Sequence, residues 1–536
     1  MGDMFKILAA DTLAEEGLVY LRGQSDAELI NRPGLSEDEL TAMISGFDGV
    51  IVRSGAQVTA RVLANPGRLK AVARAGVGVD NIDVPAATSA GVLVLNSAEA
   101  STTTTAEHAF AMLMALARNI GQAHKCMTEG GWNRSRFQGR QLSGKTLGVV
   151  GFGRIGQAVA QRALAFDMNV IAYDPFYNAA TALDGGVKIF SQIPDVLTRA
   201  DILTFHVPLN NDTHELLNAQ TFAQCRDGVL VVNASRGGVI DERALLDALH
   251  SGKCGGAALD VFETEPPERD SPLRSHPSVL MTPHLGASTI EAQAAVSVDA
   301  ATSLLEYLRG QSVRGAVNVV GLRLDLDPVQ NHYVDLAQRM AQLLSPMTTS
   351  GISAVTIEIA GQDLTAAVGT IERLALIGLL QPHLDTRLNL VNVKHVAEQR
   401  GMMLRAVMAD EQKMSGPQIA IEVDSTDRIH RIVGRVYSDL RPRIVEINGY
   451  HLDIVPGGNM VLIRNEDKPG MLGVVGTEFG KAQINIADMA ISRRGNSAVM
   501  LLRVDTEPPA ELTARLLDNR GILKVALVKL PEEMGS

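Results

Sequence analysis

The sequence predicts an α/β protein of several domains, in which parallel sheets come first and mixed α+β segments follow. The chain has 536 residues, enough for about three or four domains of ordinary size. Hydrophobic residues make up 46% of it but aromatic residues only 4%, so its cores depend on small aliphatic side chains, as in buried parallel sheets. Short apolar runs alternate with helix-like stretches through most of the first 310 residues, which indicates consecutive βα units.

The first βα series occupies about the first hundred residues. A helix expected over residues 105–118 follows it, and because this helix is apolar on all sides we expect it to be buried between domains or subunits. The expected strands of this series are residues 4–10, 49–53, 69–73 and 91–95.

A second βα series starts at Lys145. Six strands with intervening helices form a doubly wound sheet, and a further helix is expected over residues 291–309. The expected strands are residues 145–150, 169–174, 201–205, 229–233, 256–260 and 279–281.

The pattern changes after Gly315. Residues 317–455 mix alternating strands with helices, which predicts an α+β domain. Pro456-Gly457-Gly458 then interrupts the chain. The remaining segment, residues 459–536, has the order βαββαβ, which is the ferredoxin-like arrangement.

Charge and cysteine content exclude several classes of function. A net charge of −11 argues against nucleic acid as the main partner. The three cysteines, Cys126, Cys225 and Cys254, are far apart, so we expect no disulfide framework, no metal site and a cytoplasmic location. We expect no signal peptide and no membrane span, since no apolar run reaches 18 residues.

A glycine motif opens the second series. Gly151, Gly153 and Gly156 have the G-x-G-x-x-G spacing, directly after a strand and before a helix. The first glycine permits a tight turn, the second lets the backbone approach a pyrophosphate, and the third lets helix and strand pack closely. The helix N-terminus then offers free N–H groups to the phosphates.

An acidic residue completes the dinucleotide signature. Asp174 ends the next strand, 23 residues after Gly151, where its carboxylate can accept hydrogen bonds from the ribose hydroxyls. Residues 175–177 supply no cation for a 2′-phosphate. The cofactor is therefore expected to be NAD and not NADP.

Three polar side chains follow expected strands of the same sheet. Arg236, Glu265 and His284 should meet at the carboxyl edge of the strands, where such sheets bind ligands. Histidine suits the removal of a hydroxyl proton while a hydride leaves for nicotinamide. A neighbouring carboxylate orients the ring, and arginine can hold a substrate carboxylate in a bidentate fork. The trio predicts the oxidation of a secondary alcohol on a substrate that also carries a carboxylate.

Six stretches of the sequence resemble the D-2-hydroxyacid dehydrogenase family, and within it the long-form D-3-phosphoglycerate dehydrogenases. They span nearly all of residues 1–316. They are RAGVGVDNID (74–83), GKTLGVVGFGRIG (144–156), HVPLNNDTHELLN (206–218), VVNASRGGVIDE (231–242), AALDVFETEPP (257–267) and TPHLGAST (282–289).

The resemblance implies a domain plan. A flavodoxin-like, discontinuous substrate domain (1–104 and 288–316) encloses a Rossmann-like nucleotide domain (105–287). An intervening α+β domain (317–455) and an ACT domain (459–536), a small amino-acid-sensing module, follow.

The resemblance also implies roles for individual residues. His284 is the acid–base, with Arg236 and Glu265 as the other catalytic residues. Val77 replaces a threonine that often contacts the cofactor phosphate. The substrate contacts are Arg53, Ser54, Gly55 and Arg74, with Arg134 supplied by a partner subunit. The cofactor contacts, besides the three glycines and Asp174, are Arg154, Ile155, His206, Val207, Pro208, Asn233, Ala234, Ser235, Asp260, His284, Leu285, Gly286 and Ala287.

The C-terminal extension implies regulation. By resemblance, Asn465, Asp467 and Asn485 would face L-serine at an interface between two ACT units of a homodimer or homotetramer. Three further residues, Arg441, Arg443 and His451, could form an anion site, although a solvated basic surface is the better interpretation.

The sequence leaves three hypotheses open for the function of the protein. The leading one is NAD-dependent oxidation of 3-phospho-D-glycerate, the first step of phosphorylated serine synthesis. The others are another D-2-hydroxyacid dehydrogenase, such as a glyoxylate or hydroxypyruvate reductase, and a non-catalytic NAD-sensing scaffold of the same fold. The long extension favours the first.

Overall fold

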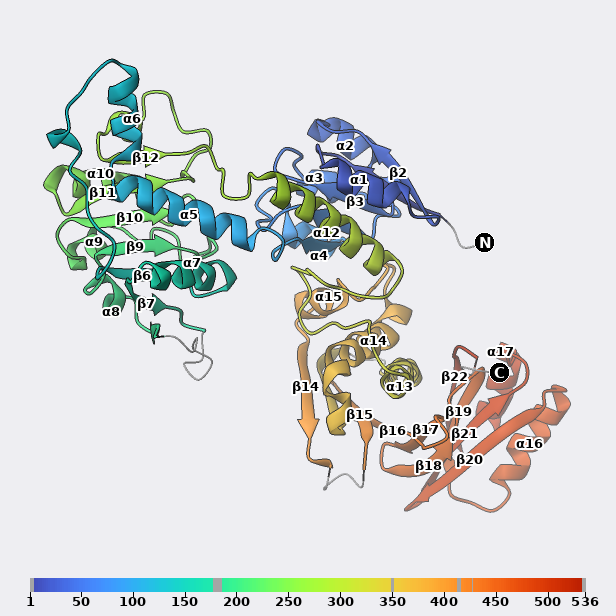
Figure 1. Cartoon of the computed structure of the whole chain (residues 1–536). Coiled ribbons are helices and arrows are strands. Elements are labelled where there is room, and N and C mark those ends of the chain that lie inside the picture. Colours follow the sequence, from blue (N-terminus) through green and yellow to red (C-terminus); the bar gives the residue numbers. More distant parts are fainter. Residues whose placement is uncertain (1–3, 177–185, 349–350, 412–415, 427, 533–536) are drawn as a thin grey trace.

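The computed structural model describes residues 4–176, 186–348, 351–411, 416–426 and 428–532. These residues form four sheets, which Figure 1 shows as successive bodies along the chain. The first two sheets are parallel and the last is antiparallel, as the α/β and ferredoxin-like predictions require. None of the helices in the described part of the chain combines the length and the apolar character needed to cross a bilayer.

The first sheet has five parallel strands in the order β2-β1-β3-β4-β5, the flavodoxin-like order. One strand, Ala27–Asn31, was not expected, because it is a partly exposed edge strand with only two large apolar residues. The elements are β1 (Phe5–Ala9), α1 (Glu15–Arg22), β2 (Ala27–Asn31), α2 (Glu37–Met43), η1 (Ile44–Gly46), β3 (Gly49–Val52), α3 (Ala60–Leu63), β4 (Ala71–Arg74), α4 (Val84–Ser89) and β5 (Leu93–Asn96).

The second sheet has seven parallel strands in the order β12-β11-β10-β9-β6-β7-β8. The prediction of six strands was wrong by one, because the edge strand Lys188–Phe190 is too short to stand out. The elements are η2 (Ser135–Phe137), β6 (Thr146–Val150), α7 (Arg154–Ala165), β7 (Asn169–Tyr173), β8 (Lys188–Phe190), α8 (Pro194–Leu197), β9 (Ile202–Phe205), α9 (Ala219–Gln224), β10 (Val229–Asn233), α10 (Glu242–Ser251), β11 (Cys254–Leu259), α11 (Pro272–Ser275) and β12 (Val279–Met281).

Two long helices connect these sheets. The chain leaves the first sheet through α5 (Thr102–Ala117), which packs along α7 and is followed by α6 (Ile120–Thr128). It returns through α12 (Ile290–Leu308), which packs against α1 so closely that a Cβ at Gly17 would meet Ser297 at 2.8 Å. The crossings thus lie beside the expected domain boundaries at 104 and 288, whose positions stay a prediction.

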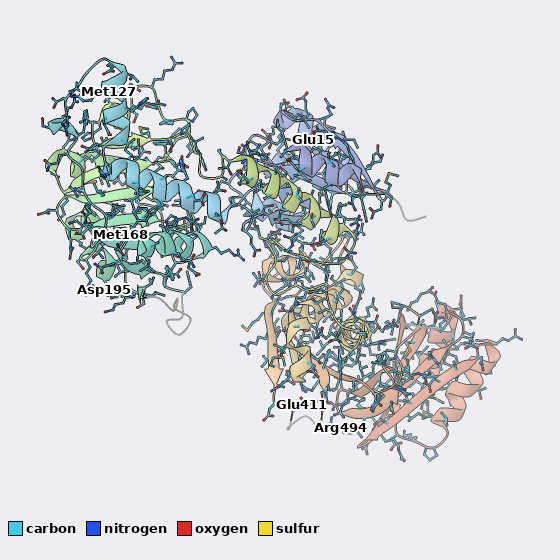
Figure 2. The ribbon with its side chains drawn as sticks, viewed as in Figure 1. Glu15, Met127, Met168, Asp195, Glu411 and Arg494 are labelled. Atoms are coloured by element: carbon cyan, nitrogen blue, oxygen red, sulfur yellow. The ribbon has the colours of Figure 1, made fainter. Side chains whose placement is uncertain are left out.

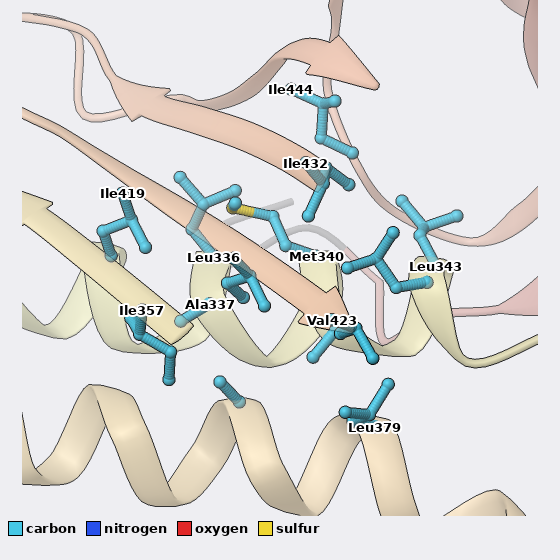
Figure 3. Close-up of a cluster of buried hydrophobic side chains, with 14 of the residues drawn as sticks. Leu336, Ala337, Met340, Leu343, Ile357, Leu379, Ile419, Val423, Ile432 and Ile444 are labelled. Atoms are coloured by element: carbon cyan, nitrogen blue, oxygen red, sulfur yellow. The ribbon is translucent and has the colours of Figure 1, made fainter. Parts of the chain in front are cut away.

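The third sheet is mixed, in the order β14-β13-β15-β16-β17-β18, and helices α13 and α14 pack on it. Its core is aliphatic: Figure 3 shows Leu336 and Met340 of α13 among Ile419, Val423 and Ile432 of the sheet. Each such side chain contributes about 2 kcal/mol on burial. The elements are α13 (Pro328–Leu344), η4 (Ser345–Met347), β13 (Ile352–Ala360), η5 (Gln362–Ala367), α14 (Val368–Leu380), η6 (Gln381–His383), α15 (Val393–Gln399), β14 (Met403–Ala409), β15 (Gln418–Ser425), β16 (Ile429–Val436), β17 (Pro442–Ile447) and β18 (Tyr450–Ile454).

The fourth sheet has the antiparallel order β20-β21-β19-β22, so the βαββαβ prediction is confirmed. It shares a buried core with the third sheet, to which its strands contribute Met460, Leu462 and Leu501. Beside this core, Arg494 at the end of β20 (labelled in Figure 2) donates to the carbonyl oxygen of Asn448 at 3.1 Å. The elements are β19 (Asn459–Glu466), α16 (Met471–Lys481), β20 (Ile486–Arg494), β21 (Ser497–Val504), α17 (Ala510–Asp518) and β22 (Ile522–Lys529).

A buried arginine fastens the fourth sheet to the third. Arg339 on α13 is only 2% exposed, and Asp335 one turn earlier accepts from its Nε at 2.6 Å. Its Nη1 donates to the carbonyl oxygens of Pro456 at 3.0 Å and Pro531 at 2.5 Å, and its Nη2 to that of Glu532 at 2.9 Å. One side chain therefore holds both ends of the fourth sheet's segment.

Replacing Arg339 should loosen this attachment. Arg339→Met leaves Asp335 and three carbonyl groups without their donor, which should cost about 3–5 kcal/mol of stability. Hydrogen exchange should quicken in β19 and β22 and stay unchanged in β6 and β9. Arg515→Met, which breaks a more exposed pair with Glu478, is the control and should cost under about 1 kcal/mol. Equal hydrogen-exchange rates of β19 and β22 in both variants would show that Arg339 does not attach the fourth sheet to the third.

Candidate active site

A cleft of about 780 Å³ lies between the first two sheets, where the carboxyl ends of their strands meet. The first sheet contributes the loops after β3 and β4, and the second contributes the loops after β6, β9, β10, β11 and β12. The cleft therefore gathers groups that lie more than 200 residues apart in the sequence. Its lining includes Arg53, Ser54, Arg74, Val77, Ile155, His206, Val207, Pro208, Ala234, Ser235, Arg236, Glu265, His284, Gly286 and Ala287.

The glycine motif forms a turn whose three glycines have different tasks. Gly151 has φ +91°, and a Cβ there would run into the carbonyl oxygen of His206. Gly156 lies against the carbonyl oxygen of Gly151, so any side chain there would push α7 away from β6. Gly153 caps α7, and a Cβ there would meet nothing within 4 Å. The open space at the helix N-terminus fits a dinucleotide pyrophosphate.

Asp174 lies beside this turn. Its Oδ2 accepts from the N–H of Phe152 at 3.0 Å and its Oδ1 from that of Phe176 at 3.0 Å. The carboxylate is thus held at the turn, with lone pairs left for ribose hydroxyls. Tyr177 lies outside the described residues. The glycines and this acid together fit NAD.

His284 and Glu265 form a hydrogen-bonded pair in the cleft. Nδ1 of His284 lies 2.8 Å from Oε2 of Glu265, and Oε1 of that glutamate accepts from the N–H of Phe262 at 3.1 Å. The pair leaves Nε2 as the imidazole nitrogen that is free to act on a substrate. The glutamate is itself held in place, so the ring has a defined orientation.

The backbone of His284 is unusual and is held by Asp260. His284 has φ +55°, a left-handed conformation that costs a non-glycine residue about 1–3 kcal/mol. Asp260 is completely buried and binds the backbone N–H groups of residues 284, 285 and 286. Burial by itself raises the pKa of the Asp260 carboxyl, but hydrogen bonds from His108, Thr282 and Leu285 outweigh it, so the pKa lies below its ordinary value.

Arg74 and Arg236 lie together in the cleft, near the one acid, Asp80, with which Arg236 pairs. Burial and the charge of Arg236 lower the pKa of Arg74 to about 10, and its buried Nε has no hydrogen-bond partner among the described residues. Arg236 donates to Asp80 at 3.0 Å. Gly76 and Gly78 make room for them, since a Cβ at either would collide with a guanidinium. An anionic substrate would offset the repulsion between the two guanidinium groups.

The loop after β3 brings a third arginine. Asp11, two residues beyond β1, accepts from the N–H of Arg53 at 2.6 Å and from that of Ala56 at 3.0 Å. A Cβ at Gly55 would meet the same carboxylate at 2.5 Å. Arg53 itself donates to the carbonyl oxygen of Thr12 at 3.0 Å. This local ring of contacts fixes Arg53 and Ser54 at the cleft.

Comparison with known proteins matches three parts of the chain to family models. The model described as "D-isomer specific 2-hydroxyacid dehydrogenase, NAD binding domain" matches residues 110–286. The model "D-3-phosphoglycerate dehydrogenase intervening domain" matches residues 329–448, and "ACT domain" matches residues 459–521. The D-3-phosphoglycerate dehydrogenases of Archaeoglobus fulgidus and Bacillus subtilis are 37% and 38% identical to this chain over 98% of its length and 100% of theirs.

This chain belongs to the D-3-phosphoglycerate dehydrogenase family. Solved structures resemble a smaller part of it. The TT0316 protein from Thermus thermophilus is 32% identical, with a TM-score of 0.54, over 58% of this chain and 99% of that one. A glyoxylate reductase from Paecilomyes thermophila is 27% identical, with a TM-score of 0.55, over 59% and 99%. The family's parallel-sheet fold is thus shared with other dehydrogenases, whereas the full-length match is to D-3-phosphoglycerate dehydrogenases.

Some residues expected to bind the cofactor lie apart from the cleft lining. Asn233 is buried and binds Ser235 and the carbonyl oxygen of Arg236, so it shapes the loop after β10. Arg154, at the start of α7, forms an exposed pair with Glu99 at 2.6 Å. His206 does line the cleft, and burial lowers the pKa of its ring to about 4, so it is neutral.

Arg134 lies in an exposed loop and is not among the residues that line the cleft of its own chain. A role for it in the partner's cleft stays a prediction. The sequence reasoning missed Asp80, Ser101, Thr105 and Gln293, which also line the cleft. No spacing pattern singles them out, because loops and helix starts place them there.

The three residues expected to bind serine do not meet within one chain. Asp467 is paired with Arg493 at 2.8 Å, near one end of β20, and Asn485 precedes the other end, where it donates to Asp505 at 2.9 Å. Asn465 is buried, and its Oδ1 has no hydrogen-bond partner among the described residues. A shared site would need a second chain.

The basic cluster before the ACT segment is paired with acids. Arg443 lies 3.3 Å from Asp453, and Arg441 lies 4.0 Å from Asp439. His451 is exposed. These contacts favour a solvated basic surface over an anion site.

The turn glycines should respond differently to substitution. Gly156→Ala should lower the melting temperature of the free protein, because the new Cβ collides with backbone. Gly153→Val faces open space, so the free protein should melt normally, while the stabilisation by NAD is lost. Differential scanning fluorimetry with and without NAD measures both. A normal NAD shift in Gly153→Val would place the pyrophosphate elsewhere.

Proposed function

We propose that the chain is an NAD-dependent dehydrogenase that oxidises 3-phospho-D-glycerate to 3-phosphooxypyruvate, the first step of phosphorylated serine synthesis. The observation that carries this proposal is the meeting of the His284–Glu265 pair with Arg53, Arg74 and Arg236 in one cleft. The proposed substrate has a hydroxyl for the histidine and two anionic groups for the arginines. Relatives that match 98% of the chain are named D-3-phosphoglycerate dehydrogenases.

His284 acts as the base in the proposed oxidation. Its Nε2 accepts the proton of the C2 hydroxyl while the electron pair of that O–H bond forms the C2=O bond. NAD, when bound, accepts the hydride that leaves C2. Glu265 accepts the Nδ1–H hydrogen bond and so stabilises the imidazolium that forms. In the reverse direction His284 returns the proton to the carbonyl oxygen.

The arginines bind and polarise the substrate. Arg236 pairs with the C1 carboxylate beside the reacting carbon, and its charge stabilises negative charge on the C2 oxygen. Arg53 and Arg74 bind the phosphate from the first sheet, and Arg134 of a partner subunit completes the site in a homodimer or homotetramer. The pairing of Arg236 with Asp80 orients its guanidinium toward this task.

A glyoxylate or hydroxypyruvate reductase is the nearest alternative, and a related structure is indeed a glyoxylate reductase. That structure covers only 59% of this chain and has no counterpart to the rest. The intervening and ACT segments therefore favour the phosphoglycerate reaction. A cytoplasmic location agrees with three cysteines that are all free.

His284→Asn should lower kcat by about 10²–10⁴-fold, the usual contribution of general acid–base catalysis. NAD affinity should change little, because the substitution leaves the glycine turn untouched. Stopped-flow absorbance of NADH and calorimetric NAD titration measure the two effects. His250→Asn, on the surface of α10, is the control. Near-normal turnover of folded His284→Asn would remove this histidine from the reaction.

Arg74→Ala should weaken kcat/KM for 3-phosphoglycerate by about 10–100-fold, since a charge-assisted contact contributes about 1.5–3 kcal/mol. The loss for unphosphorylated glycerate should be much smaller. The free energy of unfolding should not fall, because the lost cation is half-buried and lacks an Nε partner. Arg61→Ala, an exposed residue, is the control. If kcat/KM fell equally for 3-phosphoglycerate and for glycerate, Arg74 would bind the carboxylate that both substrates carry and not the phosphate.

We also propose that L-serine inhibits the enzyme at an interface between two ACT units, where Asn465, Asp467 and Asn485 would meet. Serine would have to displace Arg493 from Asp467 with its ammonium group. Asn485→Ala should abolish inhibition and leave the uninhibited rate intact. Full activity at millimolar serine, with no heat of binding in calorimetry, would leave the ACT unit only an assembly role.

A further inference from the structure

A buried cluster lies directly behind the turn that carries His284, and the carboxylate of Asp260 is its centre. Oδ1 of Asp260 accepts from the hydroxyl of Thr282 at 2.6 Å and from the N–H of Leu285 at 2.8 Å. Its Oδ2 accepts from the N–H of Gly286 at 2.8 Å, and its carbonyl oxygen accepts from the N–H of His284 at 2.9 Å. One buried residue thus binds three successive N–H groups of the turn.

A histidine on helix α5 completes this cluster. Nε2 of His108 lies 3.1 Å from Oδ1 of Asp260 and 3.2 Å from the hydroxyl oxygen of Thr282. Because the threonine hydroxyl donates to the carboxylate, the hydrogen-bond network assigns the Nε2–H of His108 as a donor shared by both oxygens. The histidine therefore supplies the only side-chain N–H that the described residues offer to this carboxylate.

We propose that His108 is a positioning residue for the oxidation, which acts through Asp260 on the backbone of His284. The inference rests on the proposed function of His284 as the base. A buried carboxylate keeps its charge only with a full set of donors, and this charge holds the N–H groups of Leu285 and Gly286, directly after His284. Without His108 the carboxylate loses one donor, and the left-handed backbone of His284 loses part of what fixes it.

The position of His108 fits an indirect role. It is not among the residues that line the cleft, although Ser101, which precedes α5, and Thr105, within its first turn, are. The same helix carries the chain away from the first sheet (Figure 1). His108 thereby ties the base to the element that joins the two halves of the cleft. The effect of its removal should fall mainly on kcat, because the substrate arginines and the glycine turn after β6 stay in place.

Substitution of His108 tests this role in the full-length protein. His108→Leu should lower kcat about tenfold or more, since an error of about 1 Å in a reacting group can cost up to about 10²-fold. The KM values for NAD and 3-phosphoglycerate should change less than about threefold. His108→Gln keeps an N–H donor and should restore most of kcat. His250→Leu, at a surface histidine whose ring packs edge-on against that of His276, is the control.

A double-mutant cycle distinguishes positioning of the base from a general structural effect. In the His284→Asn background, His108→Leu should lower kcat less than about twofold, because the group that it positions is gone. Thr282→Val removes another donor to Asp260 and should behave in the same way, which covers the case in which His108→Leu does not fold.

Three outcomes would count against the inference. If the wild-type enzyme oxidises no 2-hydroxyacid, the proposed function fails and this inference with it. If the wild type is active but His108→Leu and Thr282→Val match His250→Leu, the positioning role alone is overturned. The positioning role is also overturned if the double variant loses kcat by the product of the two single fold-decreases, because independent effects multiply in this way.

Discussion

The chemistry of this protein depends on one constraint, that parallel strands end at the same edge of a sheet. The first sheet brings Arg53 and Arg74 to that edge and the second brings Arg236 and His284, so two separate sheets share one cleft. In the described part of the chain two crossings join them, through α5 and α12. Each crossing begins with residues that line the cleft, which couples the relative position of the sheets to the geometry of the site.

The charge of the cleft differs in sign from the net charge of the whole molecule. The chain carries a net charge of −11, yet the cleft gathers three arginines around the histidine–glutamate pair and one further acid, Asp80. Burial and the nearby Arg236 make the charge of Arg74 costly in the free protein. An excess of positive charge of this kind is expected in a site that binds an anion. A substrate with both a carboxylate and a phosphate fits it.

Sequence reasoning succeeded where one residue type has one physical task. Gly151 and Gly156 allow no side chain, and the structure gives both the close approach that the motif predicts. The βαββαβ order was also readable, because its strands are long and apolar. Short edge strands were missed, since Lys188–Phe190 and Ala27–Asn31 owe their pairing to neighbours already in place. His108 was missed because a lone histidine on a helix has no pattern, and only the fold brings it to Asp260.

The most direct test of the account is a comparison of substrates with the wild-type enzyme. The rate of NADH formation should be measured at 340 nm with 3-phosphoglycerate, glycerate, lactate and 2-hydroxyglutarate. Three arginines that serve two anionic groups predict that kcat/KM for 3-phosphoglycerate exceeds that for glycerate by about tenfold to a hundredfold, the worth of a charge-assisted contact. An unphosphorylated acid that is used as well as or better than 3-phosphoglycerate would contradict the assignment of the cleft.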